Sequence, residues 1–197
     1  MSKYTVQIED VKSIRDRRDI PGFLRKINVE KVCEIGVKEG ANFTNLLVPC
    51  VQKAVAIDCW VETGIRSQND DNCSLDVLNK QYQNMLNLAN RDKRVQVIKD
   101  FSLNACLQFE DNYFDFVYID ADHTESAVYA DLNAWYKKVR SGGVLAGHDY
   151  CDMTLIYGPE TVKFGVIPAV NKFVQENKLQ LHVDNEEPWH DWFIVKP

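Results

Sequence analysis

The sequence predicts an α/β fold with a doubly wound, mostly parallel sheet. Short apolar runs rich in Val and Ile alternate along the chain with longer segments of helical periodicity. Several of these runs end in glycines, carboxylates or histidines, and open parallel sheets bind their ligands at the carboxyl ends of the strands. We therefore expect the residues that directly follow the strands to form the functional site.

Length, composition and charge limit the classes of protein to consider. With 197 residues, 45% of them hydrophobic, the chain should form one core that buries roughly 70% of the surface exposed by the unfolded chain. It has neither a run of about 18 apolar residues nor a secretory signal, so we expect a soluble, cytoplasmic protein that does not bind membranes. The net charge of −6 comes without a basic stripe, which argues against nucleic acid as a partner. Six cysteines without a C-x-x-C pair indicate neither a zinc site nor a secreted disulfide framework.

Residues 1–30 are expected to form a helical extension before the main domain, residues 31–197. A helix is predicted around residues 11–18, and Pro21-Gly22 is expected to separate it from a second short amphipathic piece. Two interpretations stay open. The extension is either a lid over the active site or a surface helix that packs on the sheet.

The first predicted strand, residues 32–35, leads into a turn with Gly36 and Gly40 and then a helix at residues 42–51. Glycine can take positive φ angles and has no Cβ, so backbone amides can approach a ligand closely at the start of that helix. The glycine spacing fits neither the G-x-G-x-x-G dinucleotide pattern nor the phosphate-binding loop. Glu34, just before the turn, suits a ligand that carries positive charge.

A second strand is predicted at residues 53–58, and it ends in Asp58, about 20 residues after the glycine turn. At this spacing an acid can hold a ribose diol, because a carboxylate accepts hydrogen bonds from both hydroxyls. Trp60 then either stacks on an adenine ring or fills the core. A polar loop at residues 62–71 and an amphipathic helix follow.

The pattern of Glu34, Gly36, Gly40 and Asp58 resembles that of the class I S-adenosylmethionine-dependent methyltransferases. The resemblance implies that S-adenosylmethionine is the cofactor and that Glu34 lies near its methionine end. It also implies that Gly36 and Gly40 shape the turn beside it and that Asp58 binds its ribose.

A third strand is predicted at residues 94–100 and ends in Asp100, with Phe101 beside it. In the family that the chain resembles, an acid here commonly accepts the adenine amino group, so the resemblance implies a donor-binding role for both residues. The alternative role of Asp100 is to cap the next helix, predicted at residues 103–109.

Two further strands, predicted at residues 114–120 and 143–147, both end in ionisable groups. The first is the most apolar strand of the chain, which places it near the sheet centre. Ionisable groups at a buried strand end need partners or water, so these two ends are the best candidate for an active site. The residues are Asp120, Asp122 and His123 on the first strand end, and His148 and Asp149 on the second.

These two strand ends resemble a subgroup of bacterial small-molecule methyltransferases that is distantly similar to the catechol-type O-methyltransferases. The resemblance implies a divalent metal ion held by Asp120, His148 and Asp149, and it places Asp120 beside the donor as well. The catechol-type enzymes carry Asp and Asn where this chain has His148 and Asp149, and a mixed oxygen and imidazole set suits Mn, Fe or Zn better than Mg. The alternative is direct acid–base catalysis by His123 or His148, because an imidazole has an unperturbed pKa near neutrality.

The C-terminal part is predicted to cover and complete the sheet. A long connection at residues 151–165 is expected to overhang the pocket and select the substrate, and a helix should follow at residues 166–177. Two last strands are predicted within residues 179–183 and 192–196. The resemblance implies that they complete the seven-stranded, Rossmann-like sheet typical of that methyltransferase family, with its last strand antiparallel. Edge packing is the expected role of three residues there, Trp189, His190 and Trp192.

The expected function is therefore S-adenosylmethionine-dependent methylation of a hydroxyl group on a small molecule, such as a sugar or a secondary metabolite. Two alternatives remain. The chain is either a metal-dependent hydrolase or oxygenase on the same type of fold, or an S-adenosylmethionine-binding protein without catalytic activity. The sequence leaves open whether the chain forms a homodimer.

Overall fold

The computed structural model describes residues 4–62, 74–157 and 160–197. Nearly all of the polar loop predicted at residues 62–71, and Gly158-Pro159, lie outside the described residues. No helix within the described ranges is long and apolar enough to cross a membrane.

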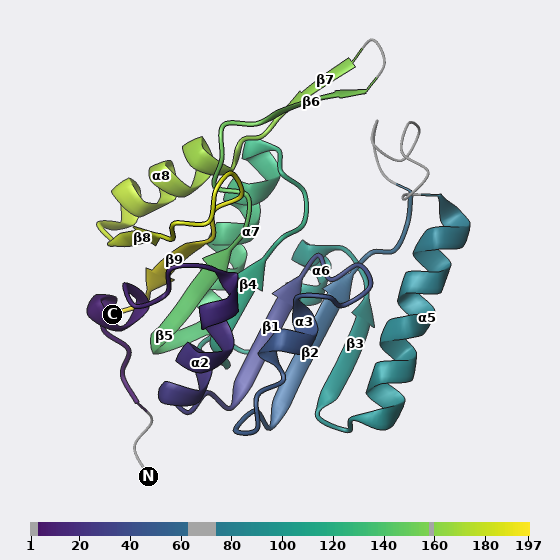
Figure 1. Ribbon diagram of the computed structural model, residues 1–197, viewed down its shortest axis with the longest axis horizontal. Helices are drawn as coiled ribbons and strands as arrows, with labels where there is room; N and C mark the ends of the chain where they lie inside the picture. The colour runs from purple at the N-terminus through teal and green to yellow at the C-terminus, as the bar shows by residue number, and fades with distance from the viewer. Residues whose placement is uncertain (1–3, 63–73, 158–159) are drawn as a thin grey trace.

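A seven-stranded sheet forms the centre of the molecule (Figure 1). The first five strands in sequence are mutually parallel, and β9 pairs antiparallel with both β5 and β8. This arrangement confirms the predicted doubly wound sheet and its antiparallel last strand. In spatial order the strands are β3 (Val95–Lys99), β2 (Lys53–Asp58), β1 (Lys31–Ile35), β4 (Phe114–Ile119), β5 (Val139–Gly147), β9 (Trp192–Val195) and β8 (Leu181–Val183).

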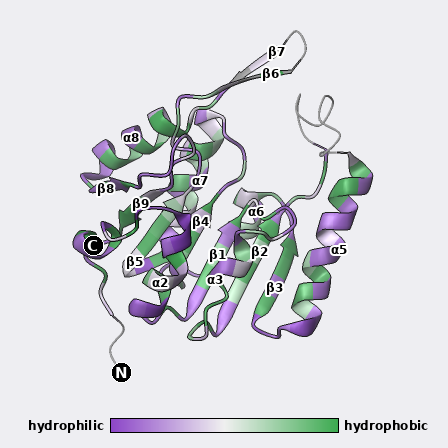
Figure 2. Cartoon of the chain, in the orientation of Figure 1, coloured by the Kyte–Doolittle hydropathy of each residue, from purple (hydrophilic) through white to green (hydrophobic). Residues whose placement is uncertain are grey.

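Helices cover both faces of the sheet, because successive side chains of each strand point to opposite faces. In β1, Val32 packs into the core cluster on one face and Cys33 into the cluster on the other. The strands are correspondingly apolar along most of their length (Figure 2). The first face carries α1 (Ile8–Val11), α2 (Ile20–Lys26), α3 (Phe43–Leu46) and α5 (Leu75–Arg91), and the second carries α6 (Ser102–Cys106), α7 (Glu125–Lys138) and α8 (Val166–Asn177).

The N-terminal extension differs from its predicted form. No helix covers residues 11–18, because α1 ends at Val11 and a 3-10 turn, η1, occupies Arg17–Asp19. Pro21 does not separate two helices but lies in the first turn of α2, where its missing N–H leaves no hydrogen bond unmade. The apolar side chains of this segment belong to the core cluster on the first face. The extension is therefore built into the domain.

Two other segments also differ from the sequence-based prediction. The helix predicted at residues 42–51 is reduced to the four residues of α3, too short to add a significant dipole to the glycine turn. The predicted loop at residues 151–165 contains an antiparallel hairpin, β6 (Thr154–Tyr157) and β7 (Glu160–Lys163). This hairpin projects beyond the body of the domain (Figure 1).

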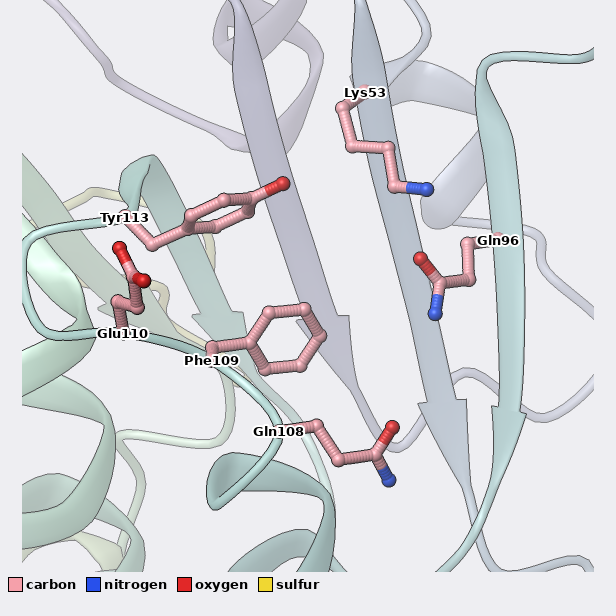
Figure 3. Close-up of a pocket in the computed structure, with 6 residues that line it drawn as sticks. All are labelled: Lys53, Gln96, Gln108, Phe109, Glu110 and Tyr113. Atoms are coloured by element: carbon pink, nitrogen blue, oxygen red, sulfur yellow. The ribbon is translucent and has the colours of Figure 1, made fainter.

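A surface cavity of about 400 Å³ lies at the opposite end of the sheet from the carboxyl ends of the parallel strands. Figure 3 shows the starts of β2 and β3 on one side and the segment before β4 on the other. The cavity therefore does not belong to the predicted site. Its lining residues are Lys53, Gln96, Gln108, Phe109, Glu110 and Tyr113.

Candidate active site

Backbone hydrogen bonds beyond the strands bring the predicted site residues together. The Gly36 amide donates to Ile57 at 2.8 Å and the Asp120 amide donates to Ile35 at 2.8 Å, so the chain segments after β1 and β4 stay paired with their neighbours. The His148 amide likewise donates to the Ile119 carbonyl at 3.1 Å. The ends of β2, β1, β4 and β5 thus form one continuous edge, as expected for a parallel sheet.

The two glycines of the first turn have different roles. Both have positive φ, +86° at Gly36 and +88° at Gly40. A Cβ on Gly36 would lie 1.9 Å from the Asp120 carbonyl oxygen, so this glycine permits close packing of β1 against the backbone after β4. A Cβ on Gly40 would lie 2.5 Å from Met85 Sδ of α5. The space beside Gly40 is therefore filled by the core and not left open for a ligand.

Glu34 lies on β1 just before this turn and is almost completely buried, with 2% of its surface exposed. Burial, reinforced by the charge of Asp120, raises the pKa of Glu34 well above its usual range. Its Oε2 atom has no hydrogen-bond partner among the described residues. A cationic ligand would satisfy this oxygen and favour the ionised carboxylate.

Asp58 at the end of β2 organises the loops on either side of it. Its carboxylate accepts hydrogen bonds from the Lys38 amide at 2.9 Å and the Trp60 amide at 2.8 Å. Trp60 is fully buried, donates from Nε1 to the Lys38 carbonyl, and packs on Tyr82 at a centroid distance of 4.9 Å. The structure thus places Trp60 in the core, as in the second of its two interpretations, and its ring is closed to an adenine.

Asp100 follows β3, and both of its roles remain compatible with the structure. Its Oδ1 accepts from the Phe101 amide at 2.8 Å and from the Asn104 side chain at 3.1 Å, which stabilises the start of α6. The neighbouring Phe101 is 55% exposed. An aromatic ring exposed beside a carboxylate at a strand end can cover a planar ligand.

The metal-ligand set that the geometry supports differs from the predicted one. Three ligand atoms, from Asp120, His123 and Asp149, lie within 4.8 Å of one another, and His148 is not a member of this group. His123 Nε2 lies 2.7 Å from Asp149 Oδ2 and 3.5 Å from Asp120 Oδ1, so the protonated imidazole forms ion pairs with both carboxylates. Burial opposes the charged imidazolium, yet the contacts with Asp120 and Asp149 outweigh it and raise the pKa of His123 to about 9.

His148 instead pairs with a residue that the sequence-based analysis did not identify. Its Nδ1 lies 2.8 Å from Oδ1 of Asp191, the residue just before β9, and Asp191 is fully buried. The same oxygen accepts from the Tyr118 hydroxyl at 2.6 Å. Burial lowers the pKa of His148, but the contact with Asp191 outweighs it and raises the pKa. Asp191 thus fixes the orientation of the imidazole, whose Nε2 lies 3.6 Å from Asp149 Oδ1.

Arg17 also enters the site, although the sequence did not mark it as a site residue. Its Nη2 donates to the Tyr118 hydroxyl at 2.9 Å and to Asp191 Oδ1 at 3.3 Å. Burial alone would lower the pKa of Arg17, but the interactions with Tyr118 and Asp191 outweigh it and raise the pKa, so the guanidinium remains charged. The sequence contains one feature that could have identified Asp191, because it is an acid directly before an apolar strand. No comparable pattern around η1 identifies Arg17.

Aromatic residues border the histidine side of the site. Phe164, at the base of the β6–β7 hairpin, stacks on His123 at a centroid distance of 4.5 Å. Trp189 lies 6.2 Å from Phe164. Trp189 therefore belongs to this wall. Edge packing was predicted for Trp192, but it is buried within β9, which lies between β5 and β8 and is not an edge strand.

Comparisons with known proteins agree with this geometry. The model of a family described as "Methyltransferase domain" matches residues 33–150, more than half of the chain. An uncharacterized protein of Acanthamoeba polyphaga mimivirus is 36% identical over 86 residues, which cover 42% of this chain and 36% of that protein. The chain thus spans about a third of the length of this curated relative.

Solved structures share the fold at low sequence identity. An O-methyltransferase from Bacillus cereus in complex with SAH has a TM-score of 0.58 and 15% identity, with 91% of this chain and 80% of that chain covered. A 1,6-didemethyltoxoflavin-N1-methyltransferase from Burkholderia thailandensis has a TM-score of 0.59 and 13% identity, with 95% and 81% covered. Spermidine synthase from Thermotoga maritima has a TM-score of 0.57 and 19% identity, with 91% and 59% covered. At such identities the likeness establishes the fold alone.

Proposed function

The chain belongs to the methyltransferase-domain family, and from this premise we propose that it transfers the methyl group of S-adenosylmethionine to a hydroxyl group of a small molecule. Membership in this methyltransferase family favours methyl transfer over the hydrolase and oxygenase alternatives. The observation that carries the proposal is the single edge at which Glu34, Asp58 and Asp120 meet the His148–Asp191 pair. It combines groups suited to a cationic adenosine donor with an imidazole suited to proton transfer.

The donor lies along the ends of β1, β2 and β3. Glu34 faces its methionine end, Asp58 accepts hydrogen bonds from the ribose hydroxyls, and Asp100 with Phe101 contacts the adenine. Asp58 already accepts two backbone amides, but each carboxylate oxygen can accept a further hydrogen bond. The carboxyl groups of Glu34 and Asp120 near the turn also favour the positive sulfonium.

The acceptor lies beside His148 and the wall formed by Phe164 and Trp189. Methyl transfer is an in-line displacement in which the acceptor oxygen forms a bond to the methyl carbon while the carbon–sulfur bond breaks. The sulfur keeps the electron pair and becomes a neutral thioether. His148 Nε2 takes the hydroxyl proton, because Asp191 holds the opposite ring nitrogen and fixes the ring. The aromatic wall excludes water and favours an acceptor with an apolar face.

A divalent metal ion is a second element of the proposal, with a ligand set that differs from the one expected from sequence. Asp120, His123 and Asp149 would hold it, because their ligand atoms lie within 4.8 Å of one another. One imidazole and two carboxylates suit Mn, Fe or Zn. When bound, such an ion acts as a Lewis acid toward an acceptor oxygen.

The ligand set can be tested by Mn²⁺ binding, measured by calorimetry at neutral pH. His123→Gln should abolish binding, whereas His148→Gln, the matched control on the next strand, should leave it intact. If His148→Gln abolished binding and His123→Gln did not, the ligand set would be the one expected from the sequence, Asp120, His148 and Asp149. The absence of binding to the wild type would remove the metal from the proposal without affecting the donor site.

The central proposal is tested by calorimetric binding of S-adenosylmethionine and S-adenosylhomocysteine, followed by transfer of a labelled methyl group to a panel of small hydroxyl compounds. We expect Asp58→Ala to weaken donor binding by about 10- to 100-fold, the usual cost of lost hydrogen bonds to a charged group. If the wild type binds neither compound, the proposal fails. Tight donor binding without transfer to any member of the panel would favour the silent binding protein.

A further inference from the structure

The surface cavity at the far end of the sheet from the candidate active site has the size of a small-ligand site. Its volume of about 400 Å³ lies within the usual range of ligand pockets, about 300–1,000 Å³. Lys53 of β2 and Gln96 of β3 line one side, and Phe109 and Tyr113, from the connection between α6 and β4, line the other (Figure 3). None of the residues assigned to the donor, the acceptor or the metal ion lies at this end. A ligand bound here would therefore be an additional one.

The aromatic side of the cavity is held in place by the core. The Phe109 ring packs edge-on against the Phe114 ring at a centroid distance of 4.9 Å and lies 5.6 Å from the Tyr113 ring. Lys138 donates to the Phe109 carbonyl at 2.9 Å, which ties the backbone of this connection to α7. The rings therefore form a preformed apolar surface, and such a surface suits a flat aromatic group.

The polar groups around these rings are available to a ligand. They are the Lys53 ammonium group, the side-chain amides of Gln96 and Gln108, and the Tyr113 hydroxyl. Within residues 4–62, 74–157 and 160–197, none of them forms a hydrogen bond or an ion pair with another residue. They are half-buried or exposed, so water satisfies them in the free protein and a ligand can replace that water.

Two lysines make the β1–β2 side of the cavity positive. Lys53 is in register with Lys31 of β1, and neighbouring strands lie only about 4.8 Å apart. Lys31 Nζ lies 3.9 Å from the centre of the Tyr113 ring, so it is directed to the same face of the sheet. Like charges on neighbouring strands are unfavourable, and an anion beside them would reduce the repulsion. Glu110, the acid in the lining, lies near Tyr113 and away from Lys53 (Figure 3).

We propose that the cavity binds a small aromatic carboxylate, with its ring on Phe109 and Tyr113 and its carboxylate at Lys53 and Gln96. A carboxylate accepts hydrogen bonds from an ammonium group and an amide at the same time. β2 runs for six residues from Lys53 to Asp58, which is roughly 16 Å at 3.3 Å per residue. The ligand is thus too far from the donor to be the methyl acceptor. The cavity is a second ligand site that does not depend on the proposed function.

The test uses 2-naphthoate as the probe and 2-naphthamide as its uncharged counterpart, with binding followed by ligand-observed NMR. For a probe of this size we expect a dissociation constant on the order of 1 mM. The wild type should bind 2-naphthoate about 10-fold more tightly than 2-naphthamide. This is the lower end of the usual value of a charge-assisted hydrogen bond, because Lys53 is only half-buried.

Two variants and one control assign the binding to the cavity. Lys53→Gln should abolish the preference for 2-naphthoate and leave the affinity for 2-naphthamide unchanged. Lys80→Gln should behave as the wild type, because Lys80 is an exposed lysine of α5, on the other face of the sheet. Phe109→Leu should weaken both probes, because it removes one of the aromatic rings on which they lie.

Three outcomes would overturn the inference. The wild type could fail to bind 2-naphthoate, or it could bind both probes equally, and neither result requires a variant. Lys53→Gln could keep the full preference for the carboxylate. Loss of binding in Phe101→Ala but not in Lys53→Gln would place the probe in the donor site and would also overturn it. None of these measurements uses S-adenosylmethionine, so the proposed function is tested separately.

Discussion

The two halves of the candidate site are held together by different kinds of contacts. In the donor half, at the ends of β2 and β3, Asp58 and Asp100 accept hydrogen bonds from nearby backbone amides. In the acceptor half, ionisable side chains pair with one another, as in His123 with Asp149 and His148 with Asp191. The donor half is thus stabilised by local backbone geometry, while the acceptor half depends on coupled charges.

The largest effect on activity is expected from His148→Gln. We expect the rate of methyl transfer to fall by about 10²- to 10⁴-fold, the usual contribution of a general base, with little change in donor affinity. His182→Gln is the matched control, because His182 lies on β8 and contacts the Ile14 carbonyl at 3.0 Å and the Phe193 ring at a centroid distance of 5.9 Å, and neither of these residues belongs to the candidate site. Equal loss of donor binding and of rate in His148→Gln would show that the two halves are not separable.

The two turn glycines test how rigidly the halves are joined. Gly36→Ala should destabilise the protein by about 4 kcal/mol or more, since its Cβ would collide with backbone at Asp120. Gly40→Ala should cost about 1–3 kcal/mol, because the positive φ is strained but the flexible Met85 side chain can move. Urea denaturation measures both values. Similar losses in the two variants would mean that the backbone after β4 can shift.

The smallest effect concerns Asp131 of α7, a buried acid beside the donor half. Asp131 Oδ1 accepts from the Ser102 hydroxyl at 2.5 Å, and Ser102 begins α6. Burial raises the pKa of Asp131 to about 6. A raised pKa means that its contribution to stability is fully present below the unfolded value near 3.8 and is lost as the pH rises through about 6.

Asp131→Asn removes this titration while keeping an oxygen for Ser102. The free energy of unfolding of the variant minus that of the wild type should therefore rise between pH 4 and pH 6. The rise should be at most about 3 kcal/mol, because the pKa of Asp131 is shifted by about two units, and the difference should change little above pH 6. Melting temperatures measured across this range would check it. A difference that is independent of pH would show that Asp131 does not titrate there.

Much of the fold follows from local sequence patterns. The predicted strand at residues 53–58 coincides with β2, because parallel strands buried on both faces read as continuous apolar runs. Two predictions were wrong, the helix around residues 11–18 in the N-terminal segment and the length of the helix at residues 42–51. In short segments of mixed polarity the local sequence does not determine how long a helix is or which of its faces is buried, because tertiary packing decides both.

The sequence by itself determined which strand ends carry ionisable groups, because a carboxylate or histidine after an apolar run is visible without any contact map. Only the tertiary structure decided how these groups pair. His123 and not His148 joins Asp120 and Asp149, His148 turns to Asp191, and Arg17 is drawn inward. The contacts of Arg17 with Tyr118 and Asp191 span 101 and 174 residues of sequence. No local pattern specifies such pairs, since they arise when the N-terminal segment and β9 pack beside β4 and the buried charges find partners there.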